Sequence, residues 1–131
     1  MDISDMHLEQ KIGQMVMAGF PSDSIDKNAR SIIEDAKIGN IILFARNVKD
    51  AKSLADLNQQ MVISSTGIPA FISIDQEGGM VTRIQKGATF FPGNMAFSAA
   101  GDECDTETEG RIEGEELRAM GININIDPVL D

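Results

Sequence analysis

The stretch FISIDQEGGMVTR, residues Phe71 to Arg83, decides which fold the sequence predicts. It begins with a short apolar run that is typical of a strand covered on both faces, as in a parallel sheet. Asp75 follows this run directly, and Gly78 and Gly79 come soon after it without a helix-forming pattern. In parallel α/β folds, ligands bind at the carboxyl ends of the strands. The stretch therefore predicts a buried strand that places Asp75 in a binding loop.

The residues on either side of this stretch predict alternating strands and helices. Apolar runs predict strands at residues 41–44, 70–74 and 124–130. Apolar residues at helical spacing predict helices at residues 7–20, 24–36, 50–65 and 105–120, and the many charges of the last one predict a solvated face. Ser22 to Ser24 and Asp50 are candidate helix caps. This alternation favours an α/β fold of parallel strands, either a doubly wound sheet or a (β/α)8 barrel.

Charge and composition disfavour several classes of partner. The chain has 21 acidic and 11 basic residues, a net charge of -10, and no run of basic residues. Because phosphates and anionic lipid surfaces repel such a chain, we expect neither a nucleic-acid nor a membrane partner. The amino terminus MDISDMHLEQ lacks the basic start and apolar core of a secretion signal, so we expect a cytoplasmic protein.

The acids of the Asp75 loop allow several interpretations, of which nucleotide hydrolysis is disfavoured because no GxxxxGKS or GxxxxGKT segment occurs upstream. A carboxylate at Asp75 would accept hydrogen bonds from neighbouring sugar hydroxyls, with Arg83 adding donors from the same loop. A metal site would use oxygen ligands from Asp75, Glu77, Asp127 and Asp131, although these acids form no compact ligand motif. A purely structural ion pair between Asp75 and Arg83 would brace the turn. The residues alone leave these alternatives open.

Five segments, in order, resemble the amino-terminal part of glycoside hydrolase family 3, in its bacterial β-N-acetylhexosaminidase branch. They are KIGQMVMAGF, IGNIILFARNV, IDQEGGMVTRI, FFPGNMAFSAAGD and GEELRAMGININIDPVLD. The most specific of them contains DQEGG, followed four residues later by arginine. The resemblance implies the first three β/α units of a (β/α)8 barrel that this chain leaves incomplete. Residues 1–131 would then be the amino-terminal portion of that barrel domain, with no second domain.

The resemblance also implies a function. The family branch releases terminal non-reducing β-linked N-acetylglucosamine from cell-wall muropeptides or chitooligosaccharides, with retention of configuration and without a cofactor or metal. Its nucleophile and its acid/base residue belong to later strands, so the resemblance implies no catalytic residue in this chain and no activity of the chain alone. The implied substrate-binding residues are Asp75, Arg83 and Asp131, and the implied loop-shaping residues are Glu77, Gly78 and Gly79.

Partners and alternatives complete the expectations. The exposed edges of an incomplete barrel would be covered by the missing carboxyl-terminal part or by self-association. One departure from the family pattern is Asp127, which stands where a small residue usually precedes Pro-Val and adds a charge of unknown orientation. The first alternative is a non-catalytic sugar- or metabolite-binding module that keeps Asp75 and Arg83. The second is a metal-dependent α/β domain.

Overall fold

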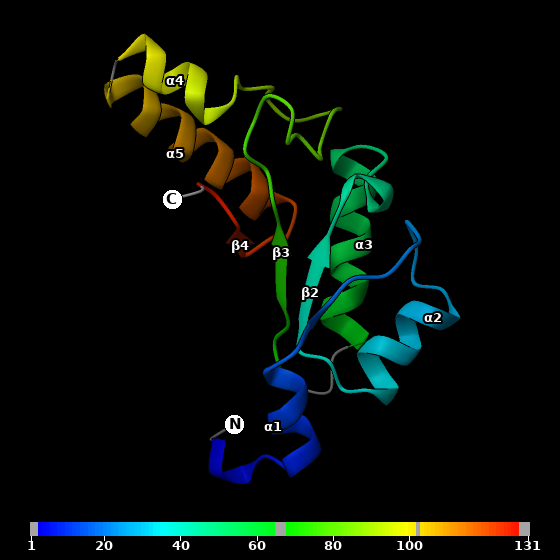
Figure 1. The fold of residues 1–131 in the computed structure, drawn as a ribbon. Helices are drawn as coiled ribbons and strands as arrows, with labels where there is room; N and C mark the ends of the chain where they lie inside the picture. The colour runs from blue at the N-terminus through cyan, green and yellow to red at the C-terminus, as the bar shows by residue number, and fades with distance from the viewer. Residues whose placement is uncertain (1–2, 65–67, 102, 129–131) are drawn as a thin grey trace.

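The computed structural model describes residues 3–64, 68–101 and 103–128, which form one sheet with helices around it (Figure 1). The strands are β1 (Met17–Ala18), β2 (Asn40–Leu43), β3 (Phe71–Ile74) and β4 (Ile124–Asn125). The α-helices are α1 (Leu8–Gln14), α2 (Lys27–Arg30), α3 (Ala51–Ser64), α4 (Asn94–Ala100) and α5 (Glu103–Ala119). A π-helical turn at Ser31–Asp35 continues α2, and 3-10 turns occupy Ile3–Asp5 and Ala45–Asn47.

The sheet is parallel throughout, in the order β1-β2-β3-β4. Its register pairs Leu43 of β2 with Ile74 of β3, and Ile74 with Asn125 of β4. All carboxyl ends therefore lie at one edge of the sheet, which is the upper edge in Figure 1. The parallel α/β class expected from the alternation of runs is confirmed, and so are the strands at β2, β3 and β4.

The expected helix at residues 7–20 is wrong in its second half. Helix α1 ends at Gln14, and Met17–Ala18 form a strand that pairs with β2. The side-chain amide of Asn40 holds this turn, because its Nδ2 donates to the carbonyls of Gln14 at 2.7 Å and Val16 at 3.2 Å. Among the described residues, the sheet thus has one strand, β1, before the three that were expected. The three expected strands are β2, β3 and β4.

The remaining helices differ from expectation in smaller ways. The cap of α2 is Asp26, whose Oδ1 accepts a hydrogen bond of 2.8 Å from the Ala29 amide, and not a residue of the Ser22 to Ser24 segment. Asp50 caps α3 as expected, since its Oδ1 accepts from the Ser53 amide at 2.7 Å. Helix α4 was not expected, because it has no buried residue and hence no clear apolar stripe.

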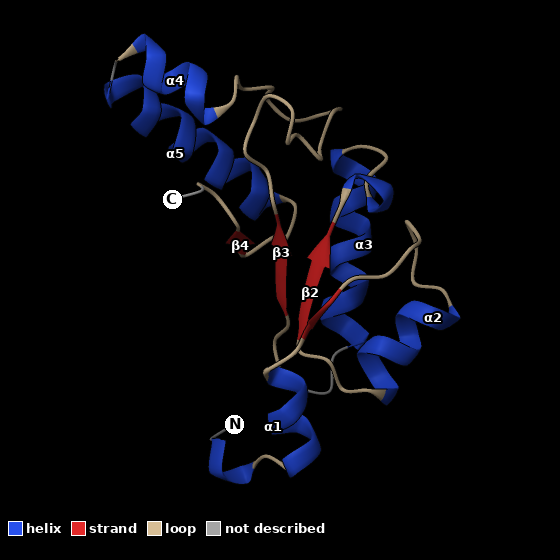
Figure 2. Cartoon of the chain, viewed as in Figure 1, coloured by secondary structure: helices blue, strands red, loops and turns tan. Residues whose placement is uncertain are grey.

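The core lies between the sheet and the helices α2 and α3, which cover one of its faces (Figure 2). Ile72 and Ile74 of β3 and Leu43 of β2 have no exposed surface, and α3 contributes Leu54 with none. A polar contact also crosses this core, since the Asn58 Nδ2 donates to the Met120 carbonyl at 2.8 Å and joins α3 to the end of α5. The core therefore holds the middle strands rigidly, and the loops at their carboxyl ends start from fixed positions.

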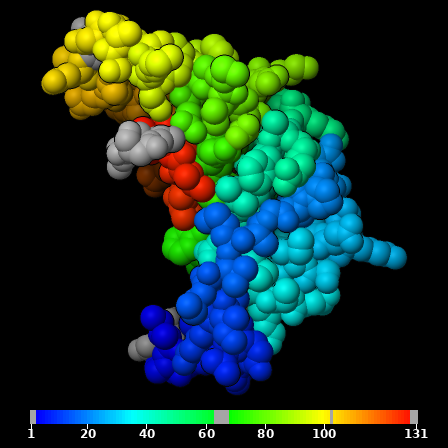
Figure 3. All heavy atoms as spheres, viewed as in Figure 1, coloured from blue at the N-terminus to red at the C-terminus, as the bar shows by residue number. Residues whose placement is uncertain are grey.

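A second apolar surface has no partner within the described part of the chain. Leu8, Ile12, Met15 and Met17 are each more than two-fifths exposed, and so is Phe71 at the start of β3. The space-filling view is hollowed between the blue amino-terminal segment and the yellow helix α4 (Figure 3). In residues 3–64, 68–101 and 103–128, no helix is both long and apolar enough to cross a membrane.

Candidate functional site at the carboxyl ends of the strands

Asp75 and Arg83 form a two-point ion pair directly after β3. The Arg83 Nε donates to Asp75 Oδ1 at 2.8 Å, and a terminal guanidinium nitrogen bonds Oδ2 of the same carboxylate. The hydrogen bond from Arg83 lowers the pKa of the Asp75 carboxyl, so both groups are charged at neutral pH. The side chains of Arg83 and Asp75 keep 26% and 21% of their surface exposed, so a ligand in solvent has access to both.

A buried glutamine sets the backbone between these two charges. The side chain of Gln76 is almost fully buried, and its Oε1 accepts hydrogen bonds from the amides of Arg83 at 2.8 Å and Ile84 at 3.2 Å. These bonds close the loop at its base and turn the Arg83 side chain back toward Asp75. Sequence reasoning treated Gln76 only as part of the DQEGG segment. A polar residue directly after a buried strand was the available signal.

Gly78 and Gly79 form the tight turn of this loop. Their φ angles are +75° and +53°, which glycine adopts without strain and other residues rarely do. The Gly79 amide donates to the Phe91 carbonyl at 2.9 Å, and a Cβ at Gly78 would lie 2.7 Å from the Pro92 carbonyl oxygen. The Glu77 amide donates to the Val81 carbonyl at 2.9 Å. The turn therefore packs directly against the segment that leads into α4.

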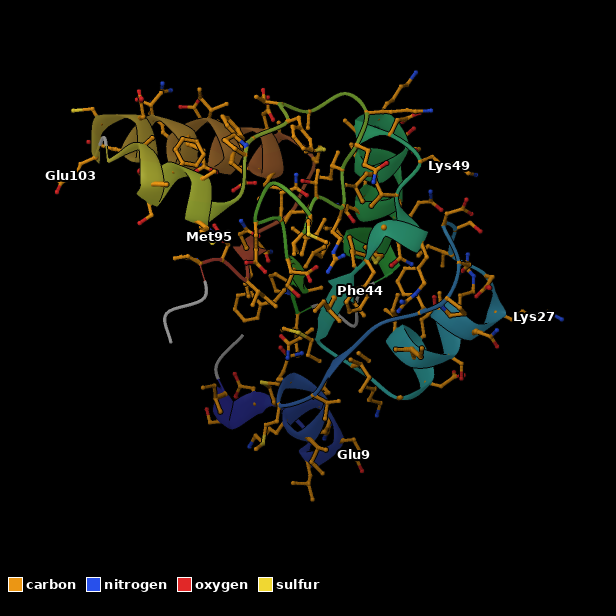
Figure 4. The ribbon with its side chains drawn as sticks, turned by 45° about the horizontal axis from the view of Figure 1, so that its top comes forward. Glu9, Lys27, Phe44, Lys49, Met95 and Glu103 are labelled. Carbon is orange, nitrogen blue, oxygen red and sulfur yellow. The ribbon has the colours of Figure 1, made fainter. Side chains whose placement is uncertain are left out.

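Phe44 is an aromatic member of the site that sequence reasoning missed. The sequence predicts it as the last residue of the strand at 41–44, but β2 ends at Leu43 and Phe44 leads into the 3-10 turn at Ala45–Asn47. The guanidinium carbon of Arg46 lies 4.5 Å from the ring centroid, and that of Arg83 lies 5.9 Å from it. With the carboxyl edge turned forward, Phe44 lies near the middle of the molecule, whereas Lys49 points outward (Figure 4).

Helix α5 presents the solvated face expected for it, but two of its acids are buried. Glu109 and Glu113 are both 6% exposed, and Asp127 follows β4. Burial, and then the negative charges of Glu109, Asp127 and Glu116, raise the pKa of Glu113 to about 7. The Asp127 Oδ1 accepts a hydrogen bond of 2.7 Å from Asn94 Nδ2, so it points toward α4.

The Glu113→Gln variant is expected to be more stable than the wild type at neutral pH. Between the unfolded pKa of 4.5 and the folded value of about 7, folded Glu113 binds a proton that the unfolded chain has lost. Wild-type stability therefore falls as pH rises through this window. Glutamine avoids the cost, so its advantage is absent below the window and reaches on the order of 3 kcal/mol above it. Urea unfolding at several pH values measures the difference, and a pH-independent difference would contradict the prediction.

The metal hypothesis finds no support among the described residues. In that part of the chain, no three His, Cys, Asp or Glu side chains gather in a way that would hold a metal ion. Asp75 is already paired with Arg83, and Asp127 is hydrogen-bonded to Asn94. Asp131, which the family resemblance implies as a substrate-binding residue, lies outside the described residues.

The described geometry defines a class of protein. It is a parallel α/β fold that presents a carboxylate, a guanidinium and an aromatic ring at the carboxyl ends of its strands, the edge where proteins of this class generally bind ligands. The family described as glycosyl hydrolase family 3 N terminal domain matches residues 7–131. The chain therefore belongs to glycosyl hydrolase family 3.

Similar proteins include a beta-hexosaminidase and a beta-N-acetylglucosaminidase. Beta-hexosaminidase A of Pseudoalteromonas piscicida is 39% identical over 109 residues, which are 76% of this chain and 18% of that protein. A family 3 beta-N-acetylglucosaminidase from Paenibacillus superposes with a TM-score of 0.90 at 44% identity, covering 94% of this chain and 24% of that one. NagZ of Neisseria gonorrhoeae, solved with N-trifluoroacetyl-D-glucosamine, has a TM-score of 0.75 at 30% identity, covering 88% and 36%. The chain thus spans about a third of these proteins or less.

Proposed function

We propose that this chain is the amino-terminal part of a β-N-acetylhexosaminidase and that Asp75 and Arg83 hold the terminal non-reducing N-acetylglucosamine. The names of the relatives support the reaction, and the complex of NagZ with a glucosamine derivative supports the sugar. The observation that carries the proposal is the two-point Asp75–Arg83 pair at the carboxyl end of β3. Muropeptides or chitooligosaccharides are the proposed sources of the sugar.

The pair retains the hydrogen-bonding capacity that a sugar needs. Each Asp75 oxygen accepts one bond from Arg83, which leaves about two of the roughly four lone-pair positions of a carboxylate for neighbouring hydroxyls. Arg83 also keeps N–H donors that Asp75 does not use. The ring of Phe44 adds an apolar face beside the guanidinium, and such a face suits the C–H surface of a pyranose.

The bond-breaking groups are proposed to lie in the rest of the enzyme. Retaining hydrolysis uses two groups that are about 5 Å apart on opposite sides of the anomeric carbon. Asp75 is held by Arg83 with a lowered pKa, so it is a poor proton donor at neutral pH. We therefore propose that later β/α units complete a (β/α)8 barrel, supply the nucleophile and acid/base, and cover the exposed apolar surface that includes Ile12 and Met17.

An aryl N-acetyl-β-glucosaminide tests the proposal. The protein in its full length is expected to hydrolyse this substrate, whereas residues 1–131 alone are expected to show no turnover above background. The reason is that four strands close only part of a barrel, which needs eight. Turnover by the 131-residue chain would contradict the placement of the catalytic groups in the remainder. No turnover by the full-length protein would contradict the proposed reaction.

A sugar-binding module without catalysis is the second candidate, because the Asp75–Arg83 pair would serve it equally well. Calorimetric titration with N-acetylglucosamine separates the two. Saturable heat without hydrolysis by the full-length protein would favour the binding module. Saturable heat together with hydrolysis would favour the enzyme.

A further inference from the structure

A continuous series of hydrogen bonds joins Glu113 of α5 to the loop that carries Arg83. The Asn125 Nδ2 donates to Glu113 Oε2 at 3.3 Å and to the Gln76 carbonyl at 2.9 Å. The Gln76 amide donates back to Asn125 Oδ1 at 3.0 Å. The Gln76 side chain then accepts a hydrogen bond of 2.8 Å from the Arg83 amide. Two amide side chains therefore separate a buried acid from the Asp75–Arg83 pair.

We propose that Glu113 is a positioning residue that sets the geometry of Arg83 through Asn125 and Gln76. Arg83 already makes two hydrogen bonds to Asp75, so the ion pair does not need an acid on α5 as a further partner. The proposed role of Glu113 is therefore to position Arg83 and not to pair with it. Any effect of this positioning on sugar binding rests on the proposed function. The series of hydrogen bonds does not rest on it, so the positioning of Arg83 and the effect on sugar binding are tested separately.

The surroundings of Glu113 make this link sensitive to its charge. Its side chain is 6% exposed, and its Oε1 is buried without a hydrogen-bond partner among the described residues. The charged groups that act on it are Glu109 and Glu116 on its own helix and Asp127 after β4, and all three are acidic. The amide of Asn94, at the start of α4, donates a hydrogen bond to Asp127. Burial and these negative charges raise the pKa of Glu113 and so favour its protonated form.

Loss of the proton places an unpaired negative charge among these acids. Because a buried charge without a partner is costly, the carboxylate is expected to move toward water and away from Asp127. The geometry of its hydrogen bond with Asn125 is then expected to change. The two hydrogen bonds between the Asn125 side chain and the Gln76 backbone are expected to change with it. Arg83 is expected to follow, since Gln76 holds its backbone amide.

Nuclear magnetic resonance of the Arg83 Nε–H in the full-length protein reads this link without any sugar. In the wild type the resonance is expected to shift with a midpoint near the Glu113 pKa of about 7. In Glu113→Gln, which keeps the size of the side chain, the shift is expected to vanish. The matched control is Glu115→Gln, an exposed acid of the same helix that pairs with Arg111, and the wild-type shift is expected to persist in it.

Asn125→Ser separates a contact series from an effect through space. Serine is too short to bridge Glu113 and Gln76, so the Arg83 resonance is expected to lose its titration. The infrared band of the Glu113 carboxyl group is identified as the band that is absent in Glu113→Gln. In Asn125→Ser this band is expected to titrate still, because Glu113 itself is unchanged. An Arg83 shift that survives either variant, or a wild-type resonance that does not titrate, would overturn the positioning role.

Sugar binding gives the second readout. Between pH 6 and pH 8, the wild-type KM for the aryl glycoside is expected to rise about fivefold, the low end of coupling between sites, with kcat little changed. The KM of Glu113→Gln is expected to stay flat. If Arg83 titrates as expected but the protein neither binds nor hydrolyses the sugar, the proposed function fails and the positioning role stands. A flat wild-type KM with a titrating Arg83 would sever the link between positioning and affinity.

Discussion

Asp75→Ala is expected to lower kcat/KM for an aryl N-acetyl-β-glucosaminide by at least about 100-fold in the full-length protein. A hydrogen bond to a charged group contributes about 1.5–3 kcal/mol, and the loss of two of them to sugar hydroxyls corresponds to this factor or more. The variant also leaves the guanidinium of Arg83, which is 26% exposed, without its two-point partner. The sugar subsite therefore loses both an acceptor and the group that orients its donor.

The matched control for this variant is Glu77→Gln, which removes a negative charge two residues away in the same loop. Among the described residues, the Glu77 side chain makes no hydrogen bond, whereas its backbone amide holds the loop through Val81. We expect kcat/KM to change by no more than about fivefold, as for a charge that acts only at a distance. Equal losses in Asp75→Ala and Glu77→Gln would show that overall loop charge, and not the grip of Asp75, governs the reaction.

Gly78→Ala is expected to lower the free energy of unfolding by about 3 kcal/mol. A residue with a side chain at the observed φ of +75° costs about 1–2 kcal/mol. The added Cβ would also lie 2.7 Å from the Pro92 carbonyl oxygen and 2.9 Å from that of Phe91, so the backbone before α4 has to move. Urea unfolding of the full-length protein measures the loss, through the shift of the midpoint at constant slope.

Two other glycines separate the causes of this loss. Gly101 also has a φ of +75°, but a Cβ added there would meet no atom of the described residues within 4 Å, so Gly101→Ala is expected to cost only the backbone strain. Gly114 lies inside α5, and a Cβ added to it would point into open space, so Gly114→Ala is expected to stabilise the protein by about 0.5–1 kcal/mol. A Gly78→Ala loss no larger than that of Gly101→Ala would refute the role of the packed turn.

Local pattern was sufficient for the elements whose environment is simple. β2 and β3 are short apolar runs with glycine or proline nearby, and α3 and α5 are long helices with recognisable caps or ends. The sequence did not predict β1, because Met17 and Ala18 fall within a series of apolar residues at helical spacing. Pairing with β2 overrode that local preference, and the Asn40 amide fixed the chain turn before it.

For the candidate site, contacts between residues close in sequence could be predicted, and contacts between residues far apart in sequence could not. Asp75 and Arg83 are 8 residues apart on one loop, so their opposite charges indicated a pair before any fold was known. Asn125 lies 49 residues from Gln76, and no local pattern relates the two. The burial of Glu113 was equally hidden, because its helix is rich in acids that do face water.

The sequence by itself determined the parallel α/β class, the loop that carries Asp75 and Arg83, and the family. Each of these follows from local segments or from their order along the chain, where periodicity, glycine positions and charge order act directly. Only the tertiary structure decided that β1 joins the sheet, that Phe44 flanks the ion pair and that Glu113 is buried. These depend on which distant segments share a surface, and burial there changes the pKa and the hydrogen bonding of a side chain in ways that its own neighbours in sequence do not specify.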